Sequence, residues 1–329
     1  MNITFTSLRK DEKEFFEKHL KEHSLKLYEN PIDKIPLKDI KKTEILVVFV
    51  FDKLGRDVLS QLPDLKLIIT RSAGVDHIDL DYCREKGIHV AHMPAYSPKS
   101  IAEHTFALLL NLTRRIKTAQ KKEEKVDFSQ KEDLLGIDLD QLTIGVIGTG
   151  RIGTQTALLA LAFGMEVLAF DIKENPMLRE KGVKYLPFDE IITKSDVITL
   201  HVPYTPKTHH LINKETVAKM KEGVYLINTS RGKVVDTDAI YEGVITGKIK
   251  GLALDVFEDE EILILKRFQE GKGSDKNLKI LKLLSFDNVI ITPHIAYFTK
   301  KAIENIKNCT LEAITLFVKG EDLGRFKVL

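Results

Sequence analysis

Cysteine is scarce in this sequence, which has only Cys83 and Cys309 among its 329 residues. The two lie far apart and have no metal-ligand spacing, so we expect reduced thiols and no metal site. The sequence also has no large excess of charge of one sign. Its 50 basic residues nearly balance 48 acidic ones and leave a formal net charge of +2. This balance gives no general case for binding nucleic acid or an anionic membrane surface.

Long apolar runs are absent as well. The longest strongly apolar stretches, residues 45–51 and 105–110, are too short to span a bilayer. Residues 1–14 are polar and charged and lack the apolar core of a signal peptide. We therefore expect a cytoplasmic protein with no membrane partner. The length suggests two domains, each able to bury a core.

The most informative stretch is residues 142–153, where an apolar run ends at glycines spaced G-x-G-x-x-G. The run predicts a buried strand, and residues 154–163 predict a helix closed by Gly164. Gly148 permits a tight turn, Gly150 lets a pyrophosphate approach the backbone, and Gly153 lets the helix pack on the strand. The N-terminus of that helix then presents free N–H groups and a positive dipole end to the phosphates.

A second predicted strand, residues 166–170, ends at Asp171, which follows Gly148 by 23 residues. A carboxylate at this point suits the ribose hydroxyls of an adenosine and would repel a 2′-phosphate. Strand, glycines, helix, strand and acid in this order indicate NAD binding. The alternatives are a tight structural turn between strand and helix, or a different nucleotide-like ligand.

The first 98 residues alternate strands and helices, which predicts a parallel α/β sheet. The predicted strands are 2–7, 25–28, 44–51, 65–70 and 88–91, and the predicted helices are 10–21, 57–62 and 79–86. Ser97 can cap the next helix, with Pro98 in its first turn. That helix, residues 99–121, is long and apolar along one face, and a charged connection follows it. Such a helix joins domains or subunits, or else lines a single core.

The remaining pattern predicts a doubly wound domain, residues 99–298, inserted into a domain made of residues 1–98 and 299–329. A final helix, residues 299–319, is expected to pack back on the first domain. Beyond the glycine stretch, the predicted strands are 183–186, 196–202, 224–229, 249–256 and 288–292, and the predicted helices are 188–194, 213–220 and 236–247.

Polar residues gather where four of these strands end. Because ligands of such sheets bind outside the carboxyl ends of the strands, we expect the active site there, in the cleft between the domains. The four segments are His201-Val202-Pro203, Thr229-Ser230-Arg231-Gly232, Asp255 with the acidic run to Glu261, and Pro293-His294.

Two of these side chains suggest a reaction. The guanidinium of Arg231 can pair with a planar carboxylate, which indicates a small carboxylic acid as substrate, unless it pairs with Asp236 instead. His294 can exchange a proton near neutral pH, although most histidines are structural. One carboxylate of the run 258–261 could raise the pKa of His294, whereas an acidic run is usually a solvated surface. The residues alone do not choose among those four acids.

Taken together, the motifs resemble the D-isomer-specific 2-hydroxyacid dehydrogenase family. The resemblance covers nearly the whole chain and implies an NAD-binding Rossmann domain inserted into a smaller flavodoxin-like α/β substrate domain. It also implies that Arg231, Glu260 and His294 are catalytic. The motifs are Arg71-Ser72-Ala73-Gly74-Val75-Asp76, Tyr96-Ser97-Pro98 with Ile101-Ala102-Glu103-His104, the glycine stretch, Asn228-Thr229-Ser230-Arg231-Gly232, Leu254-Asp255-Val256-Phe257, and Thr292-Pro293-His294.

The same resemblance assigns further contacts and implies two partners. One is a small 2-oxo or 2-hydroxy carboxylic acid, and the other is a second subunit in a homodimer through the region 99–121. The expected substrate contacts are Ala73, Gly74, Tyr96, Arg231, His294 and Tyr297. The expected NAD contacts are Gly148, Gly150, Arg151, Ile152, Gly153, Asp171, Val202, Pro203, Thr208, Thr229, Ser230, Arg231 and Asp255.

Three features resemble the D-lactate dehydrogenase branch of the family: Tyr96 before Ser97, the aromatic-rich run 294–299, and a long insertion at 261–284. We therefore expect NADH-dependent reduction of pyruvate to D-lactate. Another 2-oxoacid reductase, acting on hydroxypyruvate, glyoxylate or a bulkier acid, would share these residues. A phosphoglycerate dehydrogenase usually has an extra domain, and a formate dehydrogenase of this family lacks the glutamate–histidine pair. The non-enzymatic alternative is an NAD-sensing corepressor.

Overall fold

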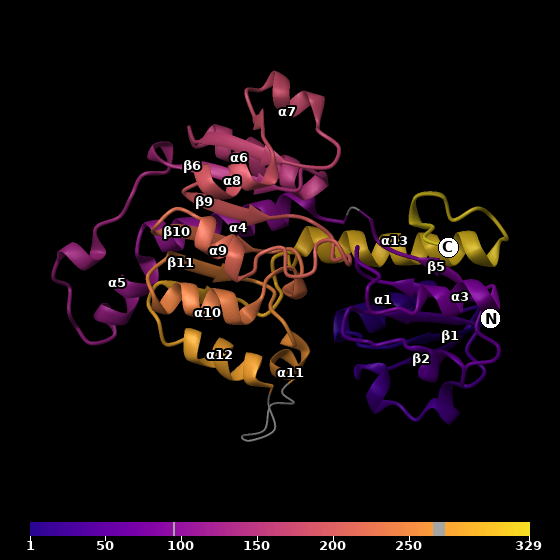
Figure 1. Ribbon diagram of the computed structural model, residues 1–329. Coiled ribbons are helices and arrows are strands. Elements are labelled where there is room, and N and C mark those ends of the chain that lie inside the picture. Colours follow the sequence, from indigo (N-terminus) through magenta and orange to yellow (C-terminus); the bar gives the residue numbers. More distant parts are fainter. Residues whose placement is uncertain (95, 266–273) are drawn as a thin grey trace. The chain divides into compact units, whose positions relative to one another are not determined.

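The computed structural model describes residues 1–94, 96–265 and 274–329. The chain folds into two compact units (Figure 1). Unit 1 comprises Met1–Ser97 and Thr299–Leu329, and unit 2 comprises Pro98–Phe298. The sequence predicted the boundaries at 98/99 and 298/299. Each unit is an α/β structure around its own parallel sheet, which confirms the expected fold class.

Unit 1 is built on a five-stranded parallel sheet with the order β2-β1-β3-β4-β5, which is the flavodoxin-like order. Its strands are β1 (Asn2–Phe5), β2 (Ser24–Leu27), β3 (Ile45–Val48), β4 (Leu67–Thr70) and β5 (His89–Ala91). Its helices are α1 (Lys10–His19), α2 (Arg56–Leu59), α3 (Leu80–Lys86) and α13 (Lys300–Val318).

Helices cover both faces of the unit 1 sheet, because successive strand side chains point to opposite sides. On one face, Val47 of β3 belongs to a core with Phe16 of α1 and Ile314 of α13. On the other face, Leu46 of β3 belongs to a core with Leu59 of α2. The final helix of the chain therefore packs on the first unit, which confirms that prediction.

Unit 2 contains a seven-stranded parallel sheet with the order β12-β11-β10-β9-β6-β7-β8. The strand order reverses at the neighbours β6 and β9, as it does in a Rossmann fold. The strands are β6 (Thr143–Ile147), β7 (Glu166–Phe170), β8 (Lys184–Tyr185), β9 (Val197–Leu200), β10 (Val224–Asn228), β11 (Ile249–Leu254) and β12 (Val289–Ile291).

Two layers of helices enclose this sheet (Figure 1). On one face, Leu226 of β10 packs in a core with Val217 of α9 and Ile240 of α10. On the other face, Ile227 packs in a core with Leu109 of α4. The helices are α4 (Pro98–Thr113), α5 (Ile116–Glu123), α6 (Arg151–Ala162), α7 (Pro176–Glu180), α8 (Phe188–Lys194), α9 (Lys214–Lys219), α10 (Thr237–Ile245), α11 (Glu260–Ile264) and α12 (Asp275–Leu283).

The structure corrects two helix predictions and adds three short helices. The single helix expected over residues 99–121 is two helices, α4 and α5, separated at Arg115, whose φ of 54° cannot continue a right-handed helix. Helix α6 begins at Arg151 rather than Thr154, directly after its N-cap Gly150. The short helices α7, α11 and α12 were not predicted.

The long helix α4 lines the core of unit 2, since Phe106, Leu109 and Leu112 are buried there. The segment that follows it, with α5, projects from the body of its unit (Figure 1). Three large apolar side chains on this segment are exposed: Val126, Phe128 and Leu135. Among the described helices, none has both the length and the apolar character that a membrane crossing requires.

Candidate active site

The glycine turn lies between β6 and α6, at the point where the strand order reverses. Gly148 has a φ of 91°, a backbone conformation that L side chains rarely adopt. A Cβ on Gly153 would lie 1.8 Å from the carbonyl oxygen of Gly148, so only glycine lets α6 pack this close to the turn. A Cβ on Gly150 would meet no atom within 4 Å, so this side of the turn is open. The turn therefore fits a pyrophosphate at the N-terminus of α6.

Asp171 follows β7 and lies beside this turn. One of its carboxylate oxygens accepts hydrogen bonds from the backbone N–H of Thr149 at 2.5 Å and from the Thr149 hydroxyl at 3.1 Å. The other oxygen accepts the backbone N–H of Lys173 at 3.0 Å. These three bonds fix a negative charge at the edge of the glycine turn, where the ribose hydroxyls of an adenosine would bind. The glycines and this acid together fit NAD.

The loop after β9 packs against the glycine turn from the neighbouring strand. The carbonyl of His201 and the side chain of Val202 would both contact a Cβ on Gly148. Within this loop the hydroxyl of Thr208 donates to the carbonyl of Pro203 at 2.7 Å. Burial lowers the pKa of His201 to about 3, so this imidazole is neutral. Val202, Pro203 and Thr208 thus belong to one folded loop beside the cofactor turn.

Arg231 lies in the tight turn that follows β10. The carboxamide of buried Asn228 shapes this turn: its oxygen accepts from the backbone N–H and the hydroxyl of Ser230, and its nitrogen donates to the carbonyl of Arg231. A Cβ on Gly232 would lie 2.2 Å from the carbonyl oxygen of Phe257, so this turn packs tightly on the loop after β11. Asp236, the alternative partner considered for Arg231, caps α10 by accepting the backbone N–H of Asp238.

His294 and Glu260 form an ion pair. Nδ1 of His294 lies 2.7 Å from Oε1 of Glu260, and both side chains are mostly buried. The other carboxylate oxygen of Glu260 accepts the backbone N–H of Phe257 at 3.1 Å. Burial disfavours the charged imidazole, but the carboxylates of Glu260 and Asp255 outweigh it and the nearby Arg231, so the pKa of His294 is raised.

This geometry selects Glu260 from the acidic run that the residues alone left open. Glu260 is the first residue of α11, and the preceding Asp259 takes the left-handed conformation with a φ of 56°. That conformation, which aspartate tolerates better than most residues, turns the chain so that the Glu260 side chain meets His294. The histidine can therefore give up a proton as a general acid, and the carboxylate stabilises its charged form.

Asp255 anchors the loop that carries His294. Its side chain is 1% exposed. One carboxylate oxygen accepts the Thr292 hydroxyl at 2.5 Å and the Ile295 backbone N–H at 2.9 Å, and the other accepts the Ala296 backbone N–H at 2.9 Å. His294 itself has a φ of 55°, so the chain is held in a sparsely populated conformation at this residue. Asp255 thus holds the loop that carries His294, in addition to its predicted place near the nicotinamide.

Two further residues at this anchor were quoted only as parts of sequence motifs, without a role. His104 of α4 places Nε2 3.1 Å from the Thr292 hydroxyl and 3.6 Å from Asp255. Burial lowers the pKa of His104 despite the nearby carboxylate of Asp255. Thr292 directly precedes Pro293-His294, and this position next to the predicted site was the sequence signal that could have identified it. Tyr297, predicted to contact substrate, lies edge-on to the His294 ring, with 6.3 Å between the ring centroids.

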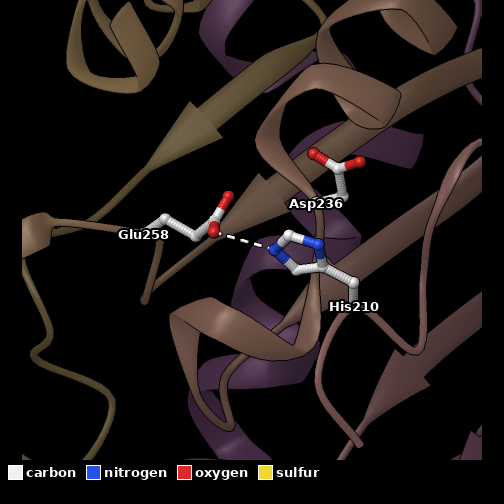
Figure 2. Close-up of side chains that lie close together, drawn as sticks. All are labelled: His210, Asp236 and Glu258. Carbon is white, nitrogen blue, oxygen red and sulfur yellow. Dashed lines mark hydrogen bonds and ion pairs between the residues drawn. The ribbon is translucent and has the colours of Figure 1, made fainter. Parts of the chain in front are cut away.

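A second cluster of titratable side chains lies at the N-terminus of α10, where Asp236 is the N-cap (Figure 2). His210, Asp236 and Glu258 bring one possible metal-ligand atom each to within 4.8 Å of one another. However, one oxygen of Glu258 accepts from His210 and Lys276, and the other accepts from the backbone and hydroxyl of Thr237. Burial opposes the charge of Glu258, but these donors lower its pKa to about 2. We therefore describe the cluster as a hydrogen-bond network around a carboxylate.

In unit 1, the predicted carboxylate-binding residues follow β4. The carbonyl of Ala73 lies 2.8 Å from Nδ1 of His92, and the carbonyl of Gly74 accepts the Ser72 hydroxyl at 2.7 Å. The backbone N–H groups of Ala73 and Gly74 have no hydrogen-bond partner among the described residues. Two N–H donors are thus available on an accessible turn. The carbonyl of Tyr96 accepts from Nδ2 of Asn305 in α13 at 2.9 Å.

A Rossmann sheet, a glycine turn with an acid at the next strand, and a carboxylate–imidazole pair define an NAD-dependent dehydrogenase. Comparison with known proteins narrows this class. Residues 106–296, more than half of the chain, match the D-isomer specific 2-hydroxyacid dehydrogenase, NAD binding domain. The chain belongs to this family, and its cofactor is NAD.

Solved structures and relatives from the family resemble nearly the whole chain. The crystal structure of D-lactate dehydrogenase from Aquifex aeolicus, complexed with NAD and lactic acid, is 54% identical with a TM-score of 0.96, and 99% of each chain is covered. A D-lactate dehydrogenase of Treponema pallidum is 36% identical over 98% of both chains. An aromatic 2-oxoacid reductase of Clostridium sporogenes is 42% identical over 82% of this chain and 81% of its own.

Proposed function

We propose that this protein is a D-lactate dehydrogenase, which reversibly reduces pyruvate to D-lactate with NADH. The observation that carries the proposal is the ion pair of His294 and Glu260 beside Arg231, at the carboxyl edge of the NAD-binding sheet. The 54% identity to a D-lactate dehydrogenase whose crystal structure contains NAD and lactic acid supports pyruvate as the substrate.

Three groups of this chain would bind and activate the 2-oxo acid. The guanidinium of Arg231 pairs with the substrate carboxylate and polarises the ketone. The N–H groups of Ala73 and Gly74 donate to the same carboxylate, and Tyr96 and Tyr297 contact the substrate. NADH, when bound, supplies the hydride for the carbonyl carbon. Arg151, Ile152, Val202, Pro203 and Thr208 contact the cofactor, together with the glycines, Asp171, Thr229, Ser230 and Asp255.

His294 would act as the general acid of the reduction. As negative charge develops on the ketone oxygen, the imidazolium donates its proton to that oxygen, and one proton is consumed for each pyruvate reduced. Glu260 stabilises the charged imidazole before the transfer. In the oxidation of D-lactate the same imidazole accepts the hydroxyl proton. Proton transfer by a positioned side chain contributes roughly a hundred- to ten-thousandfold in rate.

The second candidate function is the reduction of a bulkier 2-oxo acid. The 42% identity to an aromatic 2-oxoacid reductase of Clostridium sporogenes favours it, because both reactions need the same arginine, glutamate and histidine. Steady-state kinetics with NADH and pyruvate, hydroxypyruvate, glyoxylate, phenylpyruvate and 2-oxo-4-methylpentanoate separate the two. We expect the highest kcat/KM with pyruvate. A tenfold preference for phenylpyruvate would replace D-lactate dehydrogenase with an aromatic reductase.

We propose further that the protein is a homodimer through the region 99–121, as the sequence predicted, and that the segment after this region adds apolar surface to the contact. Val126, Phe128 and Leu135 of this segment are 82%, 73% and 78% exposed, which is unusual for large apolar side chains close together in sequence. Burial against a second copy would remove this surface from water. Light scattering of the wild type should give twice the chain mass, and Phe128→Ser with Leu135→Ser should give a larger fraction of monomer. A monomeric wild type contradicts the proposal.

A further inference from the structure

The loop that carries Glu260 is held by a second buried carboxylate. Glu258 is 4% exposed, and it accepts the backbone N–H of Thr237 at 3.0 Å and the Thr237 hydroxyl at 2.8 Å. Thr237 is the first residue of α10, so the carboxylate also lies at the positive end of that helix. This contact fixes the chain two residues before Glu260.

Helix α12 supplies the remaining support for this loop. The ammonium of Lys276 donates to the Glu258 oxygen that also faces Nε2 of His210 (Figure 2 shows the histidine and the carboxylate). The next residue, Asn277, is fully buried and donates from Nδ2 to the carbonyl of Asp259 at 3.2 Å. Ser274 caps the helix by accepting the backbone N–H of Asn277. Two consecutive side chains of one helical turn therefore bind two consecutive residues of the loop.

The two anchored residues, Glu258 and Asp259, form the turn that directs the side chain of Glu260. Asp259 has a φ of 56°, a sparsely populated conformation that persists only where surrounding contacts hold it. On the far side of the turn, the backbone N–H of Phe257 donates to Glu260. The Glu260 side chain then reaches His294 at 2.7 Å. Among the described residues, Lys276 donates to Glu258 and Asn277 to the carbonyl of Asp259, and neither is hydrogen-bonded to Glu260 or His294. Any effect they have on His294 therefore passes through the loop.

The same side chains argue against a bound cation at this place. His210, Asp236 and Glu258 have the composition of a metal site. However, the Lys276 ammonium already binds the Glu258 oxygen that faces His210, and Thr237 binds the other oxygen twice. An incoming metal ion would have to displace a positive charge from a carboxylate with four donors. A positioning role explains the arrangement without a ligand.

We propose that the first turn of α12, through Lys276 and Asn277, is a positioning element that holds the Glu258–Asp259 turn and thereby keeps Glu260 against His294. This role rests on the proposed function, because it assumes that the Glu260–His294 pair is catalytic. It also gives a structural role to the described part of the 261–284 insertion, because α12 belongs to this insertion and supports the loop that carries Glu260.

The test uses Lys276→Met and Asn277→Ala in the full-length enzyme. The readout is the pH profile of kcat/KM for pyruvate reduction, which reports the protonation of His294, whose charged neighbours are Glu260, Asp255 and Arg231. A loosened Glu260 stabilises the imidazolium less, so the midpoint of the alkaline decline should move to lower pH in both variants. At pH 8, kcat should fall roughly five- to tenfold, while the affinity for NADH stays within twofold.

Lys279→Met is the matched control. Lys279 lies on the same helix but pairs with Asp238 of α10 at 2.6 Å rather than with Glu258 or Asp259. The same substitution there should leave the midpoint unmoved. Lys276→Arg, which keeps a charge that can reach Glu258, should restore most of the wild-type profile.

Two outcomes overturn the positioning role. One is a lower melting temperature with an unmoved pH midpoint in both variants, which would show that the turn is merely structural. The other is an equal shift in Lys279→Met, which would show a general electrostatic effect. Glu260→Gln, measured in parallel, separates the two proposals. If it moves the midpoint and the α12 variants do not, only the role of α12 fails; if it does not, the catalytic pair itself fails.

Discussion

The Nδ1 atom of His294 lies 2.7 Å from Oε1 of Glu260, although 34 residues separate them in the chain. Each partner is fixed by its own loop. The Asp255 carboxylate accepts the backbone N–H groups of Ile295 and Ala296, and also the hydroxyl of Thr292. The Phe257 N–H donates to Glu260. The pair is therefore preorganised. Its geometry does not have to be created when the substrate arrives, which is the condition for efficient proton transfer.

Replacing the general acid should abolish most of the turnover. His294→Ala should lower kcat for pyruvate reduction by roughly a hundred- to ten-thousandfold, or about 3–5 kcal/mol of transition-state stabilisation. NADH affinity should change little, because the cofactor turn lies on β6. Steady-state kinetics and NADH fluorescence titration measure the two effects. His19→Ala, at the exposed end of α1, is the control. Near-normal turnover in His294→Ala would remove this residue from the mechanism.

If His294 is the general acid, its raised pKa should set the pH dependence of the reaction. Reduction needs the imidazolium, so kcat/KM for pyruvate should be highest below this pKa and decline as pH rises through it. Glu260→Gln removes the main charge that favours the imidazolium. Its decline should therefore begin at a lower pH, as rate measurements between about pH 5 and 10 would show. A profile that does not move would exclude Glu260 from the role.

The same pair should make the fold more stable at low pH. Because the folded pKa of His294 lies above its unfolded value of about 6.5, the pair's contribution is fully present below pH 6.5. It is lost as pH rises through the folded pKa. The difference in unfolding free energy between wild type and Glu260→Gln, from urea titrations, should thus be larger at pH 6 than at pH 9. A difference that grows with pH contradicts the sign of this linkage.

Arg231 should not be replaceable by another cation. Arg231→Lys keeps the charge but loses the planar fork that pairs with a carboxylate in two places. We expect kcat/KM for pyruvate to fall roughly a hundredfold, about 2.7 kcal/mol, with the loss in both KM and kcat. Lys233→Arg, two residues later in an exposed position, should retain wild-type kinetics. A lysine variant within threefold of the wild type would mean that a point charge suffices.

Asp171 should decide between the two nicotinamide cofactors. Its carboxylate, fixed by Thr149 and Lys173, would repel the 2′-phosphate of NADPH. Asp171→Ala should narrow the preference for NADH about tenfold, measured as the ratio of kcat/KM values. Glu174→Ala removes a nearby carboxylate that pairs with Arg179 and should leave the ratio unchanged. Equal use of both cofactors by the wild type would contradict the ribose assignment.

Elements whose signals are local were predicted well. The strand 166–170 has the predicted bounds, because a short apolar run between a glycine and an acid depends on neighbouring residues alone. The glycine turn also follows its prediction, since Gly153 packs on Gly148 five residues away. Local signals failed at Arg115, where the helix breaks without glycine or proline. There the long helix α4 ends, and Asn111 accepts the backbone N–H of Lys117.

The sequence by itself determined the two parallel sheets, the cofactor turn, the acid at Asp171, and the strand ends that carry Arg231 and His294. Each of these depends on residues close together in the chain, where periodicity and turn chemistry act. Only the tertiary structure decided that Asp255 anchors the His294 loop, and that α12 supports the turn before Glu260. These contacts join residues that are distant in the chain and are brought together by strand order and helix packing. A local sequence pattern does not specify strand order or helix packing. Among four neighbouring acids, position in the folded loop made Glu260 the partner of His294.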